Sequence, residues 1–138
     1  MKNFLAVFCA LFVGFAIAGC NKDGKKGEAG ESSSHLLGTT QMGAYSVKVT
    51  QDSDYKPGGK TKYMIKPSGG QGEPTAVRAW VGNESGEGSL KAKAGYDAAD
   101  GDYDAFVEVP ANPAADAKLW IEIEAGGKKE KASFPAHK

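Results

Sequence analysis

The chain has 138 residues, and its 17 Lys and Arg residues balance its 17 Asp and Glu residues. This neutral composition argues against a nucleic-acid-binding protein, because such proteins concentrate basic side chains on one surface. The 19 glycines favour many tight turns over long helices. The length suits one modest domain with a tail.

The first 19 residues have the features of a secretory signal peptide. Lys2 supplies a short positive start, and residues 4–18 are apolar and carry no charge. A membrane-spanning helix needs about 20 apolar residues, so this run is short for a transmembrane anchor. Its length suits the apolar core of a signal peptide, which is removed from the mature protein. We therefore predict that residues 1–19 take no part in the fold.

The apolar run ends with Ile17, Ala18, Gly19 and Cys20. This tetrapeptide resembles the lipobox of bacterial lipoprotein precursors, which has an aliphatic residue, a small residue, Gly or Ala, and then Cys. The resemblance implies cleavage between Gly19 and Cys20, diacylglycerol on the Cys20 thiol, and acylation of the new amine by a fatty acid such as palmitate. Acylated Cys20 would hold the protein to membrane lipid, since each buried methylene contributes about 0.8 kcal/mol.

Two other outcomes remain open for this segment. The sequence AIA at 16–18 also fits ordinary signal cleavage, which would release a soluble protein beginning at Gly19. An uncleaved membrane anchor is the other outcome. Lipidation is favoured because Cys9 is removed with the signal peptide, which leaves Cys20 as the only cysteine and without an intramolecular disulfide partner.

Residues 20–42 are rich in Gly, Lys, Glu and Ser and contain few large apolar residues. Such a segment cannot bury enough apolar surface to offset the entropy of ordering it. We predict a flexible linker here, with the lipidated Cys20 at its start. His35 has no Cys or second His at ligand spacing, which argues against a metal site in the linker.

Residues 43–138 contain short runs of alternating apolar and polar residues, separated by clusters of Gly, Pro, Asp and Asn. This rhythm is typical of an all-β sandwich or barrel. Seven strands are predicted, at residues 44–50, 61–66, 75–82, 90–96, 102–109, 118–125 and 128–134. Alternation places Tyr45, Val47 and Val49 on one inward face, and it places Tyr96 in the core as well.

The last two predicted strands have a register that can be read from the sequence. Gly126 and Gly127 form a two-residue turn, which fixes the pairing of the flanking strands. Glu124 then faces Lys129, Glu122 faces Lys131, and apolar residues meet on the opposite face, from Leu119 paired with Phe134 onward. Cross-strand pairs of this kind contribute about 0.2–1 kcal/mol each and disfavour a slipped register.

Several segments resemble bacterial Ig-like modules. The segments YSVKV (45–49), KPGGK (56–60) and YMI (63–65) are similar to the opening half of such modules, and GDY (101–103) and LWIEI (119–123) to the closing half. The closest pattern is the YtkA-like and FixH-like group of envelope domains. The resemblance implies a seven-stranded antiparallel Ig-like Greek-key β-sandwich. It also implies an alternative function, as a metal-handling (copper) accessory domain of the YtkA-like type.

Candidate chemistry is sparse in this sequence. Ser85 lacks the following x-Gly of a nucleophile elbow, and His35 and His137 stand apart from any candidate nucleophile. Copper sites need converging Met, His and Cys, but Met42 and Met64 are isolated. We therefore predict no catalytic residue, no enzyme activity, no metal site and no cofactor.

The acidic segment 97–104 has the carboxylates of a possible calcium loop. Its four carboxylates do not have the D-x-D-x-D-G order of an EF-type loop. An Asp-Gly pair between alternating strands is typical of a hairpin turn, which we favour, with weak calcium binding as an additional option.

Trp80 and Trp120 are out of phase with the aliphatic residues of their strands. If these strands are neighbours, both rings lie on the outer face of one sheet, beside Arg78. Three interpretations remain: the two rings cover each other and the charged stems, Trp80 instead points inward as a core tryptophan, or Trp80, Trp120 and Arg78 form a platform for an envelope protein or a glycan. Phe106 is also out of phase, and cover of Gly95 by its ring would explain it.

The sequence as a whole predicts a membrane-anchored bacterial lipoprotein with a non-catalytic Ig-like binding or structural module in the cell envelope. We expect a monomer with no nucleic-acid partner. In the lipoprotein family, Asn21 directly after the anchor favours the outer membrane, if the organism has one.

Overall fold

The computed structural model describes residues 34–138, and this part is all-β, with nine strands and no helix. The expected signal peptide (residues 1–19, which end at Gly19) and the expected lipid-attachment residue Cys20 lie outside the described residues. The described part therefore contains no helix that is long and apolar enough to span a membrane. The strands are β1 (His35–Met42), β2 (Tyr45–Gln51), β3 (Lys60–Gly69), β4 (Ala76–Gly82), β5 (Ala92–Lys93), β6 (Gly95–Asp97), β7 (Asp102–Glu108), β8 (Lys118–Ala125) and β9 (Lys128–Phe134).

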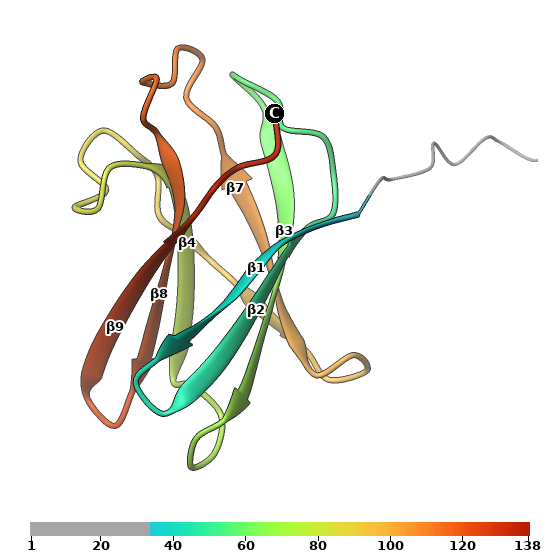
Figure 1. Cartoon of the computed structure of the whole chain (residues 1–138), viewed down its shortest axis with the longest axis vertical. Helices are drawn as coiled ribbons and strands as arrows, with labels where there is room; N and C mark the ends of the chain where they lie inside the picture. The colour runs from blue at the N-terminus through green and yellow to red at the C-terminus, as the bar shows by residue number, and fades with distance from the viewer. Residues whose placement is uncertain (1–33) are drawn as a thin grey trace, which may run out of the picture.

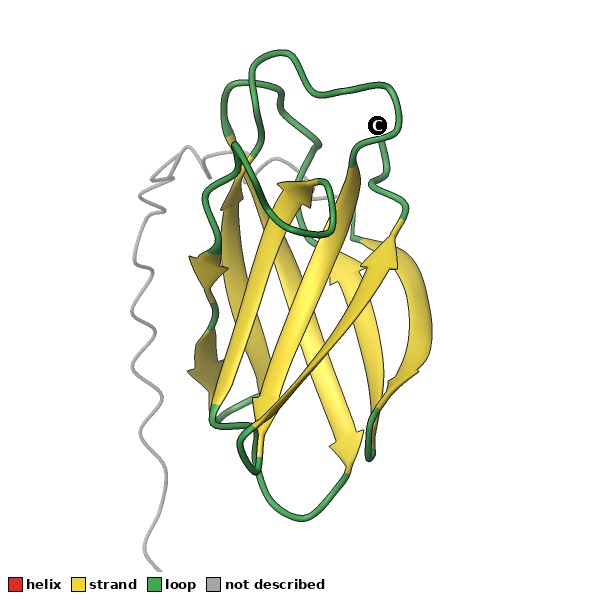
Figure 2. Ribbon diagram, turned by 90° about the vertical axis from the view of Figure 1, so that its left-hand side faces the viewer, coloured by secondary structure: helices red, strands yellow, loops and turns green. Residues whose placement is uncertain are grey.

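The strands form two antiparallel sheets that pack face to face (Figures 1 and 2). One sheet has the order β1-β2-β3-β7-β6, and the other has the order β5-β4-β8-β9. The antiparallel pairing brings the loops 52–59, 83–91 and 109–117 to the same end as the C-terminal residues 135–138 (Figure 2). We call this end the loop end.

The core lies between the sheets and is filled by alternate residues of the long strands. Val47, Val49, Ile65, Val81 and Ile121 are all fully buried there. Each large aliphatic side chain contributes about 1.5–3 kcal/mol when it is fully buried. The inward set predicted for the first strand, Tyr45, Val47 and Val49, is confirmed by this core.

The predicted register of the last hairpin is also confirmed. Glu124 pairs with Lys129, Glu122 pairs with Lys131, and Leu119 pairs with Phe134. The predicted strands 118–125 and 128–134 coincide with β8 and β9.

The structure corrects the expected linker, because β1 occupies residues that composition assigned to a flexible segment. β1 pairs with β2 over its length, with a register shift between Leu36 and Gly38. Met42 is buried at the end of β1, and Gly38 lies against the ring of Phe134. The backbone pairing with β2 and the burial of Met42 hold this segment in a fixed conformation, although its own composition is largely polar. The folded part therefore begins at His35 rather than at residue 43.

The fourth predicted strand is divided between the two sheets, which together with β1 gives nine strands instead of seven. β5 pairs with β4, and β6 pairs with β7. Between them, the amide of Ala94 donates to the carbonyl of Val77. The sequence predicts Tyr96 in the core, but Tyr96 is 46% exposed. It pairs with the buried Tyr103 and contacts its ring, but β6 is the edge strand of its sheet, so one side of the Tyr96 ring has no neighbouring strand to cover it.

Candidate functional site

Trp80 and Trp120 lie directly opposite each other on the neighbouring strands β4 and β8. Their neighbours Ala79 and Ile121 belong to the core cluster, whereas neither tryptophan does. Because alternate residues of a strand point to opposite faces, both indoles lie on the outer face of the sheet, as the sequence predicts. The interpretation of Trp80 as an inward core residue is therefore wrong.

Trp80 is nevertheless fully buried, with 0% of its surface exposed. The loop after β4 folds back over the ring, and the indole Nε1 donates to the carbonyl of Asn83 at 2.7 Å. The backbone of Gly86 lies so close that a Cβ there would be 3.2 Å from Nε1 of Trp80. The Nζ atoms of Lys91 and Lys131 lie 4.4 and 5.9 Å from the ring centroid. An exposed platform that includes Trp80 is therefore excluded.

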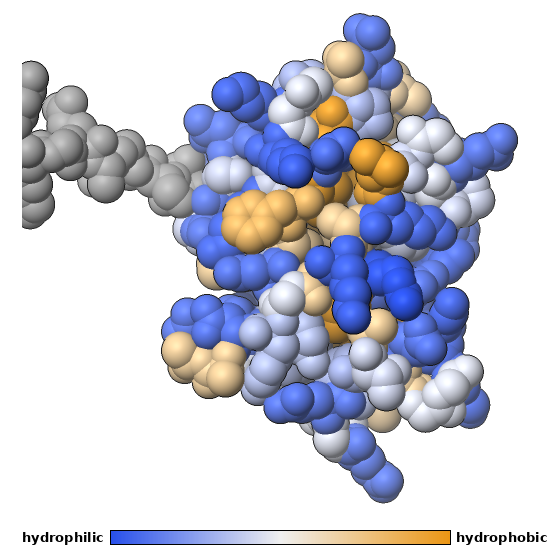
Figure 3. Space-filling view, turned by 180° about the vertical axis from the view of Figure 1, so that it is seen from behind, coloured by the Kyte–Doolittle hydropathy of each residue, from blue (hydrophilic) through white to orange (hydrophobic). Residues whose placement is uncertain are grey.

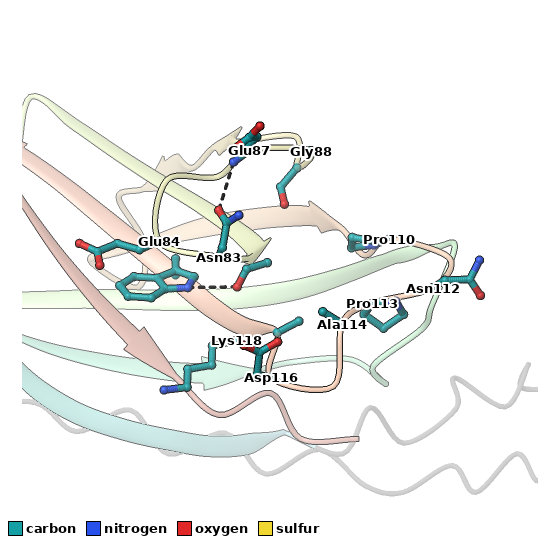
Figure 4. A pocket seen from close by; sticks show the side chains of 14 residues that line it. Asn83, Glu84, Glu87, Gly88, Pro110, Asn112, Pro113, Ala114, Asp116 and Lys118 are labelled. Carbon is teal, nitrogen blue, oxygen red and sulfur yellow. Dashed lines mark hydrogen bonds between the residues drawn. The ribbon is translucent and has the colours of Figure 1, made fainter.

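The loop over Trp80 is organised by the side chain of Asn83. Its Oδ1 accepts hydrogen bonds from the Ser85 hydroxyl at 2.9 Å, the Gly86 amide at 2.9 Å and the Glu87 amide at 3.2 Å. Figure 4 shows the hydrogen bond from Glu87. Asparagine commonly bonds the backbone just after it in this way. The loop is thus held by the hydrogen bond from the Trp80 indole to its backbone, and by the three hydrogen bonds that the Asn83 side chain accepts from residues of the loop itself.

Trp120 is only partly buried, and it lines an open cleft of about 480 Å³ at the loop end. Its Nε1 donates to the carbonyl of Gly82 at 3.1 Å, which fixes the orientation of the ring. One wall of the cleft comes from residues 82–89 and the other from residues 110–118, so that Glu87 and Asp116 lie on opposite sides (Figure 4). The cleft is the candidate binding site of this protein.

Arg78 does not join the cleft. Its guanidinium donates to Glu122 at 3.2 Å and to Glu124 at 3.1 Å. Glu122 is a charged residue with only 6% of its surface exposed, so it needs the Arg78 guanidinium as its counter-charge, and Arg78 is engaged within the sheet. The three residues of the expected platform are therefore neighbours on one face that do not form one exposed surface: Trp80 is covered, Arg78 is paired, and Trp120 faces the cleft.

Phe106 lies on the outer face of the other sheet and is 59% exposed. A Cβ placed on Gly95 would meet no atom within 4 Å, so the Phe106 ring does not cover that glycine as expected. Figure 3 shows the face opposite to that of Figure 1, where apolar residues are separated by hydrophilic ones. Exposed apolar residues that stand singly on a surface are ordinary and do not define a site.

The structure brings together two histidines that are far apart in the sequence. The rings of His35 and His137 stack with centroids 3.8 Å apart and planes at 10°. Gln51, which is 1% exposed, holds the backbone of His137 through both ends of its amide, at 2.8 and 3.0 Å. The lone pairs of stacked imidazoles lie in parallel ring planes and so do not converge on one ion. Among residues 34–138, no group of three or more His, Cys, Asp or Glu side chains could hold a metal.

The acidic segment 97–104 contains the end of β6, the turn at residues 98–101 and the start of β7. The amide of Gly101 donates to the carbonyl of Asp97 at 2.8 Å, which agrees with the predicted hairpin turn. Burial raises the pKa of the Asp102 carboxyl, and the nearby carboxylates of Asp104 and Asp100 raise it further. Burial is the larger cause of this pKa shift, and repulsion between like charges adds to it.

Sequence reasoning identified Trp120 but missed the rest of the cleft. Asn83 could have been found as a turn-forming residue just after a strand. The opposite wall, formed by residues 110–118, gives no such signal, because only the pairing of β4 with β8 brings it beside the loop after β4. Comparison of the chain with protein-family models, with curated proteins and with solved structures gives no match.

Proposed function

We propose that this chain is a bacterial lipoprotein, anchored to membrane lipid through acylated Cys20, which carries one non-catalytic Ig-like binding module in the cell envelope. The observation that carries the proposal is the tetrapeptide at residues 17–20, which ends an apolar segment at the position where lipoprotein precursors are cleaved and acylated. Cleavage there would remove Cys9, so that Cys20 has no disulfide partner, and lipid attachment is the chemistry that best explains it.

An Ig-like arrangement is supported by the strand order. Strands β2-β3-β7-β6 correspond to the A-B-E-D sheet of Ig domains, and β5-β4-β8-β9 correspond to a C-F-G sheet with one additional edge strand. In this proposal β1 is an extra strand that extends the first sheet and connects the module to its anchor.

A binding role is supported by the cleft beside Trp120. Loops that a rigid sandwich holds in place commonly carry recognition, and this cleft is built from two such loops. His35, where the folded part begins, stacks on His137 at the same loop end. The chain between Cys20 and His35 can span at most about 50 Å when fully extended, so a lipid anchor would keep the cleft near the membrane.

The anchor is tested by metabolic labelling with radioactive palmitate in a bacterial host that processes lipoproteins. We expect label in the unmodified chain and in the control variant Cys9→Ser, and no label in Cys20→Ser. Cys20→Ser should also remain as the longer, uncleaved precursor. Normal cleavage of Cys20→Ser to a soluble form would contradict lipid anchoring and would favour ordinary secretion.

A further inference from the structure

We propose that the cleft beside Trp120 binds a lysine or arginine side chain of an extended partner peptide. The inference rests on the proposed function, because it names the ligand class of the same binding module. Three features of the cleft carry it: its excess of unpaired carboxylates, its partly exposed indole ring, and its continuation along the loop end.

The charges of the cleft favour a cation. Its walls carry the carboxylates of Glu84, Glu87 and Asp116 against the single ammonium of Lys118. In the part of the chain that the structure describes, none of these four side chains forms an ion pair. A cleft that keeps uncompensated charge of one sign raises the local concentration of ligands of the other sign.

The indole of Trp120 offers the aromatic partner that such a cation needs. Trp80 already has two lysine ammonium groups close to its ring. Within residues 34–138, no lysine or arginine lies over the ring of Trp120. Indole is the most favourable aromatic surface for an ammonium or guanidinium group. The hydrogen bond to Gly82 holds the ring of Trp120 in place before a ligand arrives.

The lining beside Trp120 also suits the aliphatic stem of a lysine or arginine. Pro110, Pro113, Ala114 and Ala117 contribute apolar surface to the cleft. Long basic side chains place their methylene groups on apolar surface and keep their charged heads among polar groups.

The shape of the loop end favours an extended peptide over a free amine. Asp116, Ala117 and Lys118 line both the cleft and a second depression, which runs along residues 133–136 to Lys138. A peptide can occupy both depressions, whereas a single amine fills only one. The second depression has two ammonium groups, Lys118 and Lys138, against the one side-chain carboxylate of Asp116, whereas carboxylates outnumber ammonium groups in the cleft. The basic residue of the peptide therefore belongs at the Trp120 end.

A saccharide is the other ligand that stacks on an exposed indole. A neutral sugar gains nothing from an excess of negative charge over positive charge, so the charges decide in favour of the basic peptide. The test therefore includes a saccharide as a competing ligand.

The test is a calorimetric and fluorescence titration of the purified full-length mature chain in detergent with three octapeptides. The first alternates Lys with Ser, the second replaces each Lys by Gln, and the third replaces each Lys by Glu. We expect the Lys peptide to bind about tenfold or more tightly than the Gln peptide, and we expect the Glu peptide not to bind. Added salt should weaken binding of the Lys peptide, because exposed charges are screened.

Variants locate the binding on the cleft. Glu87→Gln and Asp116→Asn should each weaken the Lys peptide by about threefold or more, a change typical of charges at the rim of an interface. Glu108→Gln, an exposed carboxylate on the other sheet, is the matched control and should change nothing. Trp80→Phe makes Trp120 the sole tryptophan, whose emission should then change on binding. Calorimetry of the unmodified protein gives the same readout if Trp80→Phe does not fold.

Equal binding of the Lys and Gln peptides, or no binding of the Lys peptide, would overturn the proposal. Saturable binding of an N-acetylglucosamine oligomer that Trp120→Ala abolishes, without binding of the Lys peptide, would reassign the cleft to saccharides. Palmitate labelling distinguishes a failure of this proposal from a failure of the proposed function. If the chain is labelled but does not bind the Lys peptide, the ligand class is contradicted and the lipid anchor is not.

Discussion

Trp80 and Trp120 have the same side chain, face the same side of the same sheet and lie directly opposite each other. Their surroundings are nevertheless different. The backbone of the loop after β4 and the side chain of Lys91 cover the ring of Trp80. Trp120 is only partly buried and lines an open cleft. A strand pattern therefore assigns a residue to a face of a sheet, but the neighbouring loops decide whether the residue is exposed.

Replacement of the covered tryptophan should have the largest effect. We expect Trp80→Ala to lower the free energy of unfolding by about 3–5 kcal/mol, the cost of removing a fully buried large aromatic side chain. Equilibrium denaturation in urea measures this loss.

Trp120→Ala is the matched replacement on the neighbouring strand. Since its ring is already partly in water, we expect it to cost about 1–2 kcal/mol. Equal losses for the two variants would mean that both rings are equally buried and would remove the distinction between them.

A pair of glycines in the covering loop tests how closely the loop approaches Trp80. Gly86 and Gly88 both have φ of +73°, so alanine is strained at either position. A Cβ on Gly86 would meet Lys91 and Trp80, whereas a Cβ on Gly88 would meet nothing within 4 Å. We expect Gly86→Ala to be at least about 1 kcal/mol less stable than Gly88→Ala. Urea denaturation of both variants gives this difference, and identical stabilities would show that the loop does not rest on the ring.

The smallest expected effect concerns the side chain that organises the loop. Asn83→Ala removes an acceptor for three hydrogen bonds near the surface, and we expect a loss of about 1 kcal/mol. Asn112→Ala, in the opposite wall of the cleft, removes an exposed side chain and should leave stability unchanged. Hydrogen exchange should be faster for the amides of Gly86 and Glu87 in Asn83→Ala, and unchanged exchange would contradict the role given to Asn83.

Much of the fold could be predicted from alternation and turn residues. The register from Leu119 to Phe134 follows from the two glycines between β8 and β9, because a two-residue turn fixes every later pair. The start of the fold could not be predicted in this way. β1 is stabilised by its backbone hydrogen bonds to β2 and by the burial of Met42. Both depend on contacts with other segments of the chain, and the composition of β1 alone does not predict these contacts.

The candidate site was predictable only at Trp120. The outward direction of Trp80 and Trp120 follows from the period of two, but the cover over Trp80 depends on a loop that returns across the sheet. Arg78 was expected beside the rings, yet Glu122 and Glu124 neutralise it. The stacking of His35 on His137 likewise required the three-dimensional pairing of the first and last parts of the domain.

The most direct test of the difference between the two tryptophans is acrylamide quenching of single-tryptophan variants, which is feasible because the chain contains only 2 tryptophans. Trp120→Phe leaves Trp80 as the sole fluorophore, and Trp80→Phe leaves Trp120. We predict that Trp80 emits at shorter wavelength and is strongly protected from acrylamide, whereas Trp120 emits at longer wavelength and is quenched several times more steeply. Equal quenching of the two variants would contradict the account of one covered ring and one open ring.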